Sequence, residues 1–492
     1  MNTMKKYEFW FVVGSQYLYG PETLDQVAEH AQIMADQINA GGRLPSPLNY
    51  KATVKTADEI TALIKEANTD DSCAGLVVWM HTFSPSKMWI NGLALLQKPY
   101  LHLHTQFNRL IPNEEIDMDF MNLNQSAHGD REHGFIAARM KIKRKIVVGY
   151  WEDEDVQLSI ASWMRSAIGA MESKQLKLVR FGDNMREVAV TEGDKVEAQI
   201  KLGWQVNTFG VSELVQMIEA IPNTAIDKRL KELTGEYTLN TDDLESVRYQ
   251  VQVELALREF LESQGATAFS NTFEDLSGMK QLPGLATQHI MKSGYGYGGE
   301  GDWKVSAMTR IVKAMTEGLA GGTSFMEDYT YHLEEGDELV LGAHMLEVCP
   351  SLASEKPRIE VHPLGIGGKE NPARLVFEGP AGPALLISLI DLGGRMRLIA
   401  HDVELVKPIL AMPNLPVARI MWKPMPNLKV GAHAWILAGG SHHSVLSQAA
   451  TAEMMEDWAE IMDIEFIHIT KETKLEDLKQ QLFLSDLAWR LK

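Results

Sequence analysis

The stretch Ala74–Met80, AGLVVWM, decides the fold class of the first part of the chain. Its residues are almost wholly apolar, which is typical of a strand covered on both faces by helices. A shorter aromatic and β-branched run, Tyr7–Gly14, comes before it, and a helical pattern begins between the two at Pro21. This alternation predicts a doubly wound parallel sheet, in which ligands bind beyond the carboxyl ends of the strands.

The same alternation continues through the first 150 residues. The further elements we expect there are strands at Ala52–Val54, Pro99–His104 and Lys145–Tyr150 and a helix at Ala57–Ala67. Polar side chains follow three of the strand ends, in the clusters Ser15-Gln16, His81-Thr82-Phe83 and His104-Thr105-Gln106. These clusters are therefore the candidate ligand contacts of the N-terminal domain.

Composition excludes several classes of protein. The chain has 492 residues, 45% of them hydrophobic and 23% charged, which is ordinary globular composition. A net charge of -19 argues against a nucleic-acid partner or an anionic membrane surface. The two cysteines form no CxxC pair, and we find no signal peptide or membrane-spanning segment, so we expect a cytoplasmic protein.

The pattern of predicted helices and strands changes twice along the chain. A second αβ region contains predicted strands Leu178–Gly182 and Gln205–Phe209 and predicted helices Ser212–Ile221 and Asp242–Gln264. Past residue 320, short strands with Gly and Pro turns predominate until Ser447, among them Arg374–Phe377, Ala384–Asp391 and Arg395–His401. We therefore predict an N-terminal αβ domain (1–172), a central αβ domain (173–320) and a β-rich C-terminal domain (321–492).

Two segments of the β-rich region are predicted to place an acidic side chain beside an imidazole. If Thr323–Leu333 and Glu338–Val348 pair as a hairpin about the turn between them, the numbers of opposite residues sum to 671. Glu327 then faces His344 on a face that also carries Phe325, Tyr329 and Tyr331, with Phe325 opposite Leu346 and Tyr331 opposite Val340. A carboxylate there would be costly to bury unless it is paired or binds a metal. A simple Glu–His hydrogen bond and a metal site are equally compatible with this pair.

The glycine-rich segment Gly294–Lys304 adds a second acid, Glu300. Such a loop allows the backbone to approach a small ligand closely. It also matches GxGxxG, but a dinucleotide fold requires a strand before the glycines, and Thr287–Lys292 is predicted to be helical. We therefore interpret the loop as part of a small-ligand or metal site.

A pair of histidines, His442-His443, follows Gly439-Gly440 and an apolar segment, Trp435–Leu437, that we interpret as a strand. A lone His–His pair is more often structural than a metal ligand. Together with Glu300 and Glu327, however, one or two imidazoles would make a set of donors suited to a divalent ion such as Mn²⁺. The residues alone do not choose between His442 and His443.

The sequence resembles the bacterial L-arabinose isomerase family nearly from end to end. The matching segments are SQYLYGPETL (15–24), VVWMHTFSPSKMWINGL (77–93), DFMNLNQSAHGDRE (119–132), RFGDNMREVAVTEGDKV (180–196), GEGDWK (299–304), GGTSFMEDYTYH (321–332), HMLEVCPS (344–351), LGIGGK (364–369) and AWILAGGSHH (434–443). One departure is Tyr17, where the family pattern has histidine.

This resemblance implies an aldose–ketose isomerase that converts L-arabinose to L-ribulose and often also D-galactose to D-tagatose. It implies two αβ domains followed by a C-terminal domain that contains a β-barrel, assembled as trimers stacked into homohexamers. The implied site holds one Mn²⁺ per subunit on Glu300, Glu327, His344 and His443, with the two glutamates as the catalytic pair.

The resemblance also implies that Gln16 and His128 line the sugar site and are offered by a neighbouring subunit. Phe83 and Met185, which follow predicted strands in the two αβ regions, complete the expected sugar-binding residues.

Three other interpretations of the sequence remain open at this point. An isomerase of another aldose, such as L-fucose, would use a related scaffold. A non-catalytic sugar-binding protein would be expected to lack the metal cluster, and a nucleotide-dependent oxidoreductase would need a strand that ends near Ser293. For the isomerase, a cis-enediol mechanism is expected and a metal-assisted hydride shift is its alternative.

Overall fold

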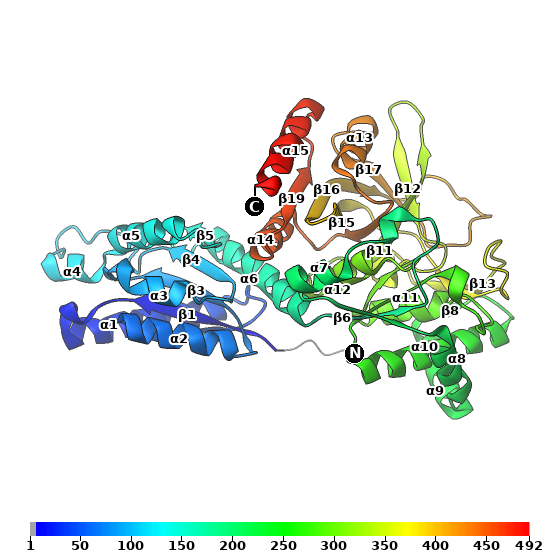
Figure 1. Cartoon of the computed structure of the whole chain (residues 1–492), viewed down its shortest axis with the longest axis horizontal. Helices are drawn as coiled ribbons and strands as arrows, with labels where there is room; N and C mark the ends of the chain where they lie inside the picture. The colour runs from blue at the N-terminus through cyan, green and yellow to red at the C-terminus, as the bar shows by residue number, and fades with distance from the viewer. Residues whose placement is uncertain (1–5, 492) are drawn as a thin grey trace. The chain divides into compact units, whose positions relative to one another are not determined.

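The computed structural model describes residues 6–491 (Figure 1). They divide into two compact units, one that ends at Met171 and one that begins at Glu172. This division does not separate residues 173–320 from residues 321–491, so the predicted domain boundaries stay predictions. Within residues 6–491, no helix is both long and apolar enough to cross a membrane.

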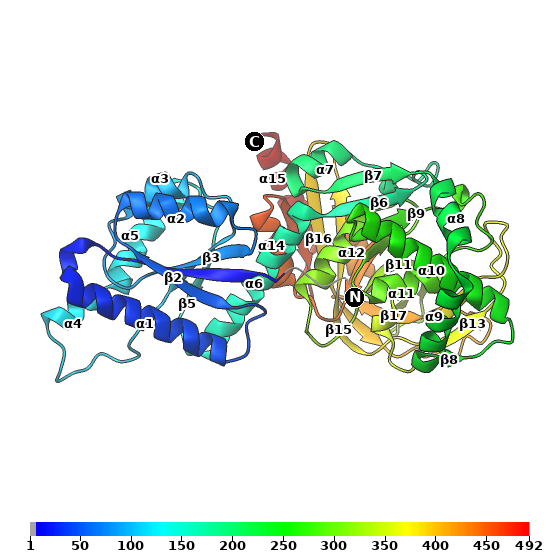
Figure 2. The same cartoon turned by 90° about the horizontal axis from the view of Figure 1, so that it is seen from below.

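The N-terminal unit is the doubly wound parallel sheet that the sequence predicts. Its strands pair in the order β2-β1-β3-β4-β5, and helices cover both faces (Figure 2). The strands are β1 (Glu8–Gly14), β2 (Leu48–Val54), β3 (Cys73–Met80), β4 (Tyr100–His104) and β5 (Lys145–Val148). Helices α1 (Gly20–Ala40) and α6 (Glu154–Gln175) lie on one face, and α2 (Ala57–Thr69), α3 (Ile90–Leu93) and α5 (Ser126–Arg139) lie on the other, while α4 (Met118–Leu123) precedes α5.

Burial explains why β3 forms at the centre of this sheet. All of its residues are buried, as expected for an apolar strand with helices on both sides. On one face, Trp10 and Val78 share a core cluster with Ile60 of α2. On the other face, Phe9 packs against Trp163 of α6, with ring centroids 5.6 Å apart.

The second unit begins with another parallel sheet, in the order β10-β9-β6-β7. Its strands are β6 (Lys177–Phe181), β7 (Gln205–Phe209), β9 (Ala268–Asn271) and β10 (Gly296–Gly298). Its helices are α7 (Lys195–Leu202), α8 (Val211–Ala220), α9 (Asn223–Glu236), α10 (Leu244–Gln264), α11 (Gly284–Lys292) and α12 (Trp303–Met315). The predicted strands near residues 178 and 205 and both predicted helices are confirmed.

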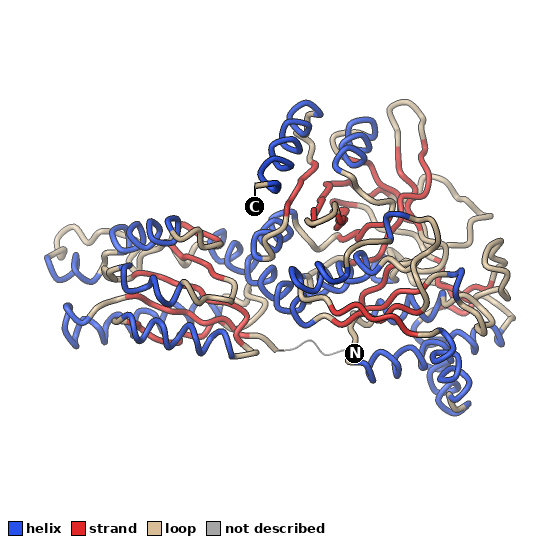
Figure 3. Tube along the Cα trace, viewed as in Figure 1, coloured by secondary structure: helices blue, strands red, loops and turns tan. Residues whose placement is uncertain are grey.

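A closed antiparallel barrel follows in the same unit. Its strands pair in the ring β15-β18-β11-β12-β17-β16, which the β15–β16 pairing closes, and β19 adds to β16 in parallel. Figure 3 shows these strands, in red, gathered on the right of the view. They are β11 (Thr323–His332), β12 (Leu339–Ala343), β15 (Gly382–Asp391), β16 (Met396–Val406), β17 (Ile420–Pro424), β18 (His443–Ser447) and β19 (Glu465–Ile469).

The remaining elements complete this unit. A small separate sheet contains β8 (Thr238–Leu239), β13 (Arg358–Val361) and β14 (Ala373–Val376), and the last helices are α13 (Leu428–Ala438), α14 (Ala452–Ile461) and α15 (Leu475–Arg490). The expected β-rich C-terminal region with a barrel is therefore confirmed. The predicted strand at Trp435–Leu437 is wrong, because this segment is part of α13. Asn427 caps that helix by accepting a hydrogen bond from Val430 N, and a three-residue apolar run cannot distinguish a strand from one face of a helix.

Helix α12 lies between the parallel sheet and the barrel. It packs against β9 and β10 on one side and against β11, β15 and β18 on the other, and nearly all of its residues are buried. Asp302 begins the helix by accepting hydrogen bonds from the backbone N–H groups of Lys304 and Val305. The loop that precedes this cap carries Glu300, so the helix fixes Glu300 at the junction of sheet and barrel.

Candidate active site

The hairpin of β11 and β12 forms, but its register differs from the prediction near the site. Tyr331 pairs with Val340 as predicted, whereas Glu327 pairs with Ala343, because a β-bulge between Asp328 and Thr330 leaves Tyr329 without an opposite residue. His344 therefore lies just beyond the end of β12 and not opposite Glu327.

The bulge also changes which side chains share a face of β11. Tyr329 lines the same cavity as Glu327, while Tyr331 turns with Asp328 into a small cavity inside the barrel. The predicted common face of Phe325, Glu327, Tyr329 and Tyr331 is thus wrong for Tyr331. The predicted pairing of Phe325 with Leu346 is also wrong, since the ladder between β11 and β12 ends at Glu327 and Ala343, and the only ladder partner of Phe325 within the described residues is Val445 of β18.

The imidazole opposite Glu327 belongs to His443. Strand β18 pairs with β11 on the side away from β12, and Glu327 is opposite His443 in that ladder. Residues opposite each other in an antiparallel pair have Cβ atoms about 4.5–5.5 Å apart. The acid–imidazole pair that the sequence placed within one hairpin is therefore formed with a strand more than 110 residues away in the chain.

Glu300 is held in an unusual backbone conformation. Its φ angle is 61°, in the left-handed region, which costs a residue other than glycine about 1–3 kcal/mol. The neighbouring glycines make room for it. A Cβ atom on Gly299 would lie 2.8 Å from His344 Cε1, and one on Gly301 would lie 2.6 Å from Asn184 Cα. Backbone strain at a close approach of several loops is typical of a functional site.

His443 is completely buried and has one ring nitrogen free for a ligand. Its Nδ1 atom lies 3.1 Å from Asp302 Oδ2, which favours a proton on Nδ1. Its Nε2 atom makes no hydrogen bond within residues 6–491 and lies 3.6 Å from Glu300 Oε2. A buried nitrogen with a lone pair and no donor beside it needs a partner, and a metal ion would satisfy it.

His344 is oriented by a second carboxylate. Its Nδ1 atom lies 2.6 Å from Glu347 Oε2, and its ring packs 4.7 Å from the ring of Phe325. Phe325 also contacts the ring of His443, at 5.1 Å, so one buried phenyl ring supports both imidazoles. Burial opposes a charge on His344, but the charge and hydrogen bond of Glu347 outweigh it and raise the pKa of His344 to about 9.

The donor atoms fit a divalent metal ion. Ligand atoms of Glu300, His344 and His443 lie within 4.8 Å of one another, and those of Glu327, His442 and His443 form a second such group. The two groups share His443, and together they contain all four predicted ligands. Carboxylate oxygens and imidazole nitrogens without thiolates suit a hard or borderline ion.

His442 is the additional member of this cluster. It is partly exposed, and its Nε2 atom lies 3.9 Å from Glu300 Oε2. Burial would raise the pKa of Glu300, but the hydrogen bond from His442 and the nearby His443 and His344 lower it below its usual value. Glu300 is therefore ionised at neutral pH, which suits either a metal ligand or a base.

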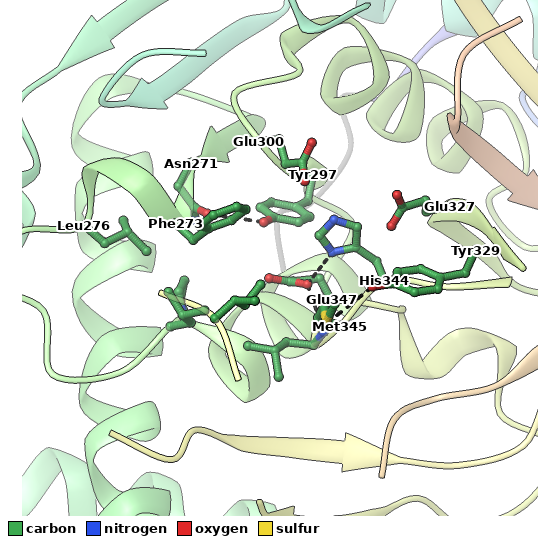
Figure 4. A pocket seen from close by; sticks show the side chains of 14 residues that line it. Asn271, Phe273, Leu276, Tyr297, Glu300, Glu327, Tyr329, His344, Met345 and Glu347 are labelled. Carbon is green, nitrogen blue, oxygen red and sulfur yellow. Dashed lines mark hydrogen bonds and ion pairs between the residues drawn. The ribbon is translucent and has the colours of Figure 1, made fainter. Parts of the chain in front are cut away.

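A cavity of about 210 Å³ opens beside these residues (Figure 4). His344 lies between Glu300 and Glu327 in this view, with Glu347 hydrogen-bonded to its ring. Pockets for drug-sized ligands measure about 300–1,000 Å³, so this cavity favours a small molecule over a dinucleotide. The dinucleotide interpretation also lacks its preceding strand, because α11 ends at Lys292 just before the glycines. The other polar or aromatic side chains of the lining are Asn271, Phe273, Tyr297 and Tyr329.

Three predicted sugar-binding residues gather at the carboxyl edge of the N-terminal sheet. Gln16 Nε2 donates to the backbone carbonyl of Phe83 at 3.1 Å, and the ring of Phe83 packs 4.5 Å from that of His128. The fourth, Met185, belongs to the other unit, where its backbone N–H donates to the carbonyl of Glu300 at 2.9 Å. Met185 thus borders the loop that carries Glu300, although its side chain does not line the cavity.

Asp302 and Glu347 are the residues of this site that the sequence analysis did not identify. Each accepts a hydrogen bond from Nδ1 of a predicted ligand and so directs Nε2 toward the other donors. Their spacing from predicted ligands in the sequence could have identified them. Asp302 lies two residues after Glu300 and Glu347 three residues after His344, so each was within reach of the site.

Comparisons with known proteins agree along the whole chain. Three family models match, described as the N-terminal domain (residues 3–175), central domain (177–318) and C-terminal domain (322–465) of L-arabinose isomerase. An L-arabinose isomerase of Thermotoga maritima is 56% identical over 493 residues, covering 100% of this chain and 99% of that protein. One from Geobacillus stearothermophilus is 56% identical over 496 residues, covering 100% of both.

Two carboxylates beside a small cavity and these full-length matches define an enzyme of the aldose–ketose isomerase class. Within that class the chain belongs to the L-arabinose isomerase family, as its motifs predicted.

Proposed function

We propose that this protein interconverts L-arabinose and L-ribulose through a cis-enediol, with Glu300 and Glu327 as its catalytic carboxylates. The observation that carries the proposal is the grouping of both glutamates around His443, whose buried Nε2 atom makes no hydrogen bond within the described residues. Two carboxylates beside one small cavity provide the base and the proton carrier that aldose–ketose isomerisation needs. D-Galactose, with D-tagatose as its product, is the second expected substrate.

Glu300, Glu327, His344 and His443 are the residues that would hold one Mn²⁺ per subunit. A divalent ion there would supply Lewis acidity, which stabilises negative charge that develops on the sugar oxygens. Asp302 and Glu347 would contribute by holding the two imidazoles with Nε2 toward the other donors of the set. No thiolate belongs to the set, which argues against a thiolate-bound zinc site and is compatible with Mn²⁺.

The two glutamates divide the proton transfers. One removes the proton from C2 of the open-chain sugar and returns it to C1, and the other exchanges a proton between O1 and O2. Glu300 is suited to accept a proton because the neighbouring histidines keep it ionised. Both steps move protons only, so the substrate is neither oxidised nor reduced overall.

Chelator-treated protein incubated with L-arabinose, with and without Mn²⁺, tests this proposal. Ketose should form only with the metal, and Glu300→Gln and Glu327→Gln should each abolish turnover while the fold persists. Activity without metal would contradict the metal site. Ketose from L-fucose but not from L-arabinose would favour the alternative aldose, and no ketose from any aldose would favour a sugar-binding protein.

Deuterium at C2 of the sugar separates the two mechanisms. Proton transfer through the enediol predicts substantial loss of the label to solvent, because the carboxylate that carries the proton exchanges with water. Complete retention at C1 of the product would instead support the metal-assisted hydride shift.

We further propose that the edge formed by Gln16, Phe83 and His128 completes the site of a neighbouring subunit in a cytoplasmic homohexamer, a dimer of trimers. Support comes from the convergence of these three side chains at the sheet edge where ligands of doubly wound domains bind. Shared sites predict complementation. Inactive Glu327→Gln and His128→Ala subunits, mixed and reassembled, should recover activity that neither has alone, and no recovery would contradict shared sites.

A further inference from the structure

The loop that follows β6, residues 182–193, directly contacts the backbone of the loop that carries Glu300, residues 299–302. Met185 donates its backbone N–H to the carbonyl of Glu300 at 2.9 Å. Glycines bound the loop at both ends, since Gly182 has φ 79° and Gly193 has φ 145°. A Cβ atom on Gly182 would lie 2.7 Å from Cβ of Asp275, so the loop leaves β6 in close contact with the segment around Asp275.

Arg186 ties this loop to that segment, the short 3-10 helix η4 (Phe273–Asp275). Its backbone N–H and its Nη1 atom each donate to Glu274 Oε2 at 2.9 Å, and its Nη2 atom donates to Asp275 Oδ1 at 2.7 Å. The other carboxylate oxygen of Asp275 accepts the backbone N–H of Asp183 at 3.0 Å. Phe273 of η4 lines the cavity (Figure 4), so Arg186 joins the Met185 loop to one wall of the site.

The backbone around Glu300 is held from two sides. Met185 binds its carbonyl, and the next residue, Gly301, donates its N–H to the carbonyl of Asn271 at 3.0 Å. Glu300 has φ 61°, and a strained conformation of this kind persists only where the surroundings over-determine it. The Met185 hydrogen bond is one of those determinants, and its donor belongs to the loop that Arg186 anchors.

We propose that Arg186 is a positioning residue for Glu300. By anchoring its loop to η4, it keeps the Met185 N–H on the Glu300 carbonyl and so keeps the carboxylate of Glu300 beside His443. The inference rests on the proposed function, in which Glu300 is catalytic and a metal ligand. The Arg186 side chain itself is 63% exposed and directed to Glu274 and Asp275, so it acts through Met185 and not on the sugar.

The expected effect is partial. A single exposed ion pair contributes little to stability. Here, however, two carboxylates and three charge-assisted hydrogen bonds converge on one residue, and such bonds are about twice as strong as neutral ones. We therefore expect Arg186→Gln to lower kcat for L-arabinose about fivefold to tenfold and to weaken Mn²⁺ binding by a similar factor. Arg186→Lys should recover part of both losses, since lysine keeps the positive charge but lacks the planar guanidinium that binds two carboxylates at once.

The experiment compares these variants with Arg248→Gln in the full-length protein. Arg248 is a matched control, because it pairs with Asp227 between α10 and α9 and, within residues 6–491, no hydrogen bond or ion pair joins it to the loop that carries Glu300. For each variant kcat, KM, the melting temperature and the Mn²⁺ isotherm of the chelator-treated protein are measured. The inference predicts losses of kcat and Mn²⁺ affinity in Arg186→Gln, smaller losses in Arg186→Lys and none in Arg248→Gln, without a matching fall in melting temperature.

Unchanged kcat and Mn²⁺ affinity in Arg186→Gln would overturn the inference. Equal losses in Arg248→Gln, or losses that only follow a lower melting temperature, would overturn it too, since they would show a general structural role. Glu300→Gln separates this failure from that of the proposed function. An active Glu300→Gln would contradict the function itself, whereas an inactive Glu300→Gln beside a fully active Arg186→Gln would contradict only the role of Arg186.

Discussion

Two carboxylates decide how the imidazoles of the site are presented. Asp302 and Glu347 each bind an Nδ1 atom, so the Nε2 atoms of His443 and His344 are directed toward the other donors of the site. Asp302 also caps α12 through its other oxygen, Oδ1, which accepts from Lys304 and Val305. One side chain thus links the start of a helix to the orientation of a ligand.

Asp302→Asn separates the two roles of Asp302, the capping of α12 and the orientation of His443. Asparagine caps helices as well as aspartate does, so the melting temperature should change little. With its oxygen on the helix N-terminus, the amide would present an NH₂ group to His443, which cannot accept the Nδ1 proton. We expect Mn²⁺ affinity to fall about 10–100-fold, as for other partners of metal-binding histidines. Calorimetric titration of the chelator-treated variant measures this, and an unchanged affinity would contradict the orienting role.

Gly299 provides a second prediction at this scale. A methyl group there would lie 2.8 Å from Cε1 and 2.9 Å from Nε2 of His344, whose ring is fixed by Glu347 and Phe325. Gly299→Ala should therefore displace the imidazole and lower activity by at least about tenfold, since the loss of a well-oriented ligand has that scale. Gly235→Ala in α9 meets open space and serves as the control. Equal activity of the two variants would show that the imidazole of His344 can move aside without loss of function.

Three helices of the central region are joined by a buried charge. Glu254 of α10 accepts hydrogen bonds from Arg229 of α9 at 3.0 Å, Arg258 of α10 at 2.9 Å and His289 of α11 at 2.8 Å. Burial would raise the pKa of Glu254, but these three partners lower it from its usual 4.5 to about 2. This carboxylate therefore stabilises the packing of the three helices only while it is ionised.

The stability that Glu254 contributes should depend on pH. Because its pKa is lowered in the folded protein, the contribution is present above pH 4.5 and is lost as the pH falls toward 2, by about 3 kcal/mol in total. Glu254→Gln removes the buried carboxylate that these partly buried side chains share and should cost about 3–5 kcal/mol at pH 7, with a flatter dependence on acid. Urea denaturation measures both. Glu232→Gln, which removes an exposed partner of the same Arg229, should cost less than about 1 kcal/mol.

At the scale of the whole molecule, the proposed metal ligands come from different layers of the second unit. Glu300 lies in the loop between the parallel sheet and α12, whereas Glu327, His344 and His443 lie on or beside strands of the barrel. A metal ion held by all four would cross-link the sheet layer to the barrel. The same four residues are far apart in the chain, so the unfolded protein offers no such site.

Mn²⁺ should therefore stabilise the folded protein. At a concentration one hundred times its Kd, a ligand that binds only the folded state adds about 2.7 kcal/mol, and the melting temperature should rise accordingly. Differential scanning calorimetry with chelator and with Mn²⁺ measures the shift. The double variant Glu300→Gln, Glu327→Gln is the control and should show almost no shift, whereas an equal shift in this variant would place the ion elsewhere.

The amino-acid sequence by itself determined the layers and the chemistry of this protein. Apolar strands such as Ala74–Met80 and amphipathic helices such as Asp242–Gln264 have periods that are visible locally, and their predicted positions agree with β3 and α10. The acids Glu300 and Glu327 stood out because carboxylates in glycine-rich or aromatic surroundings need a partner. The family motifs then singled out His443.

Only the tertiary structure decided how these pieces meet. The bulge at Tyr329 moves His344 beyond β12, and β18 brings His443 opposite Glu327. Local spacing cannot reveal either feature, because a bulge shifts the register without changing the alternation that predicts the strands, and ladder partners between distant strands depend on how the barrel closes. The apolar run Trp435–Leu437 is part of α13. Three apolar residues are compatible with a strand or with a helix, so only packing against distant parts of the chain decided between the two.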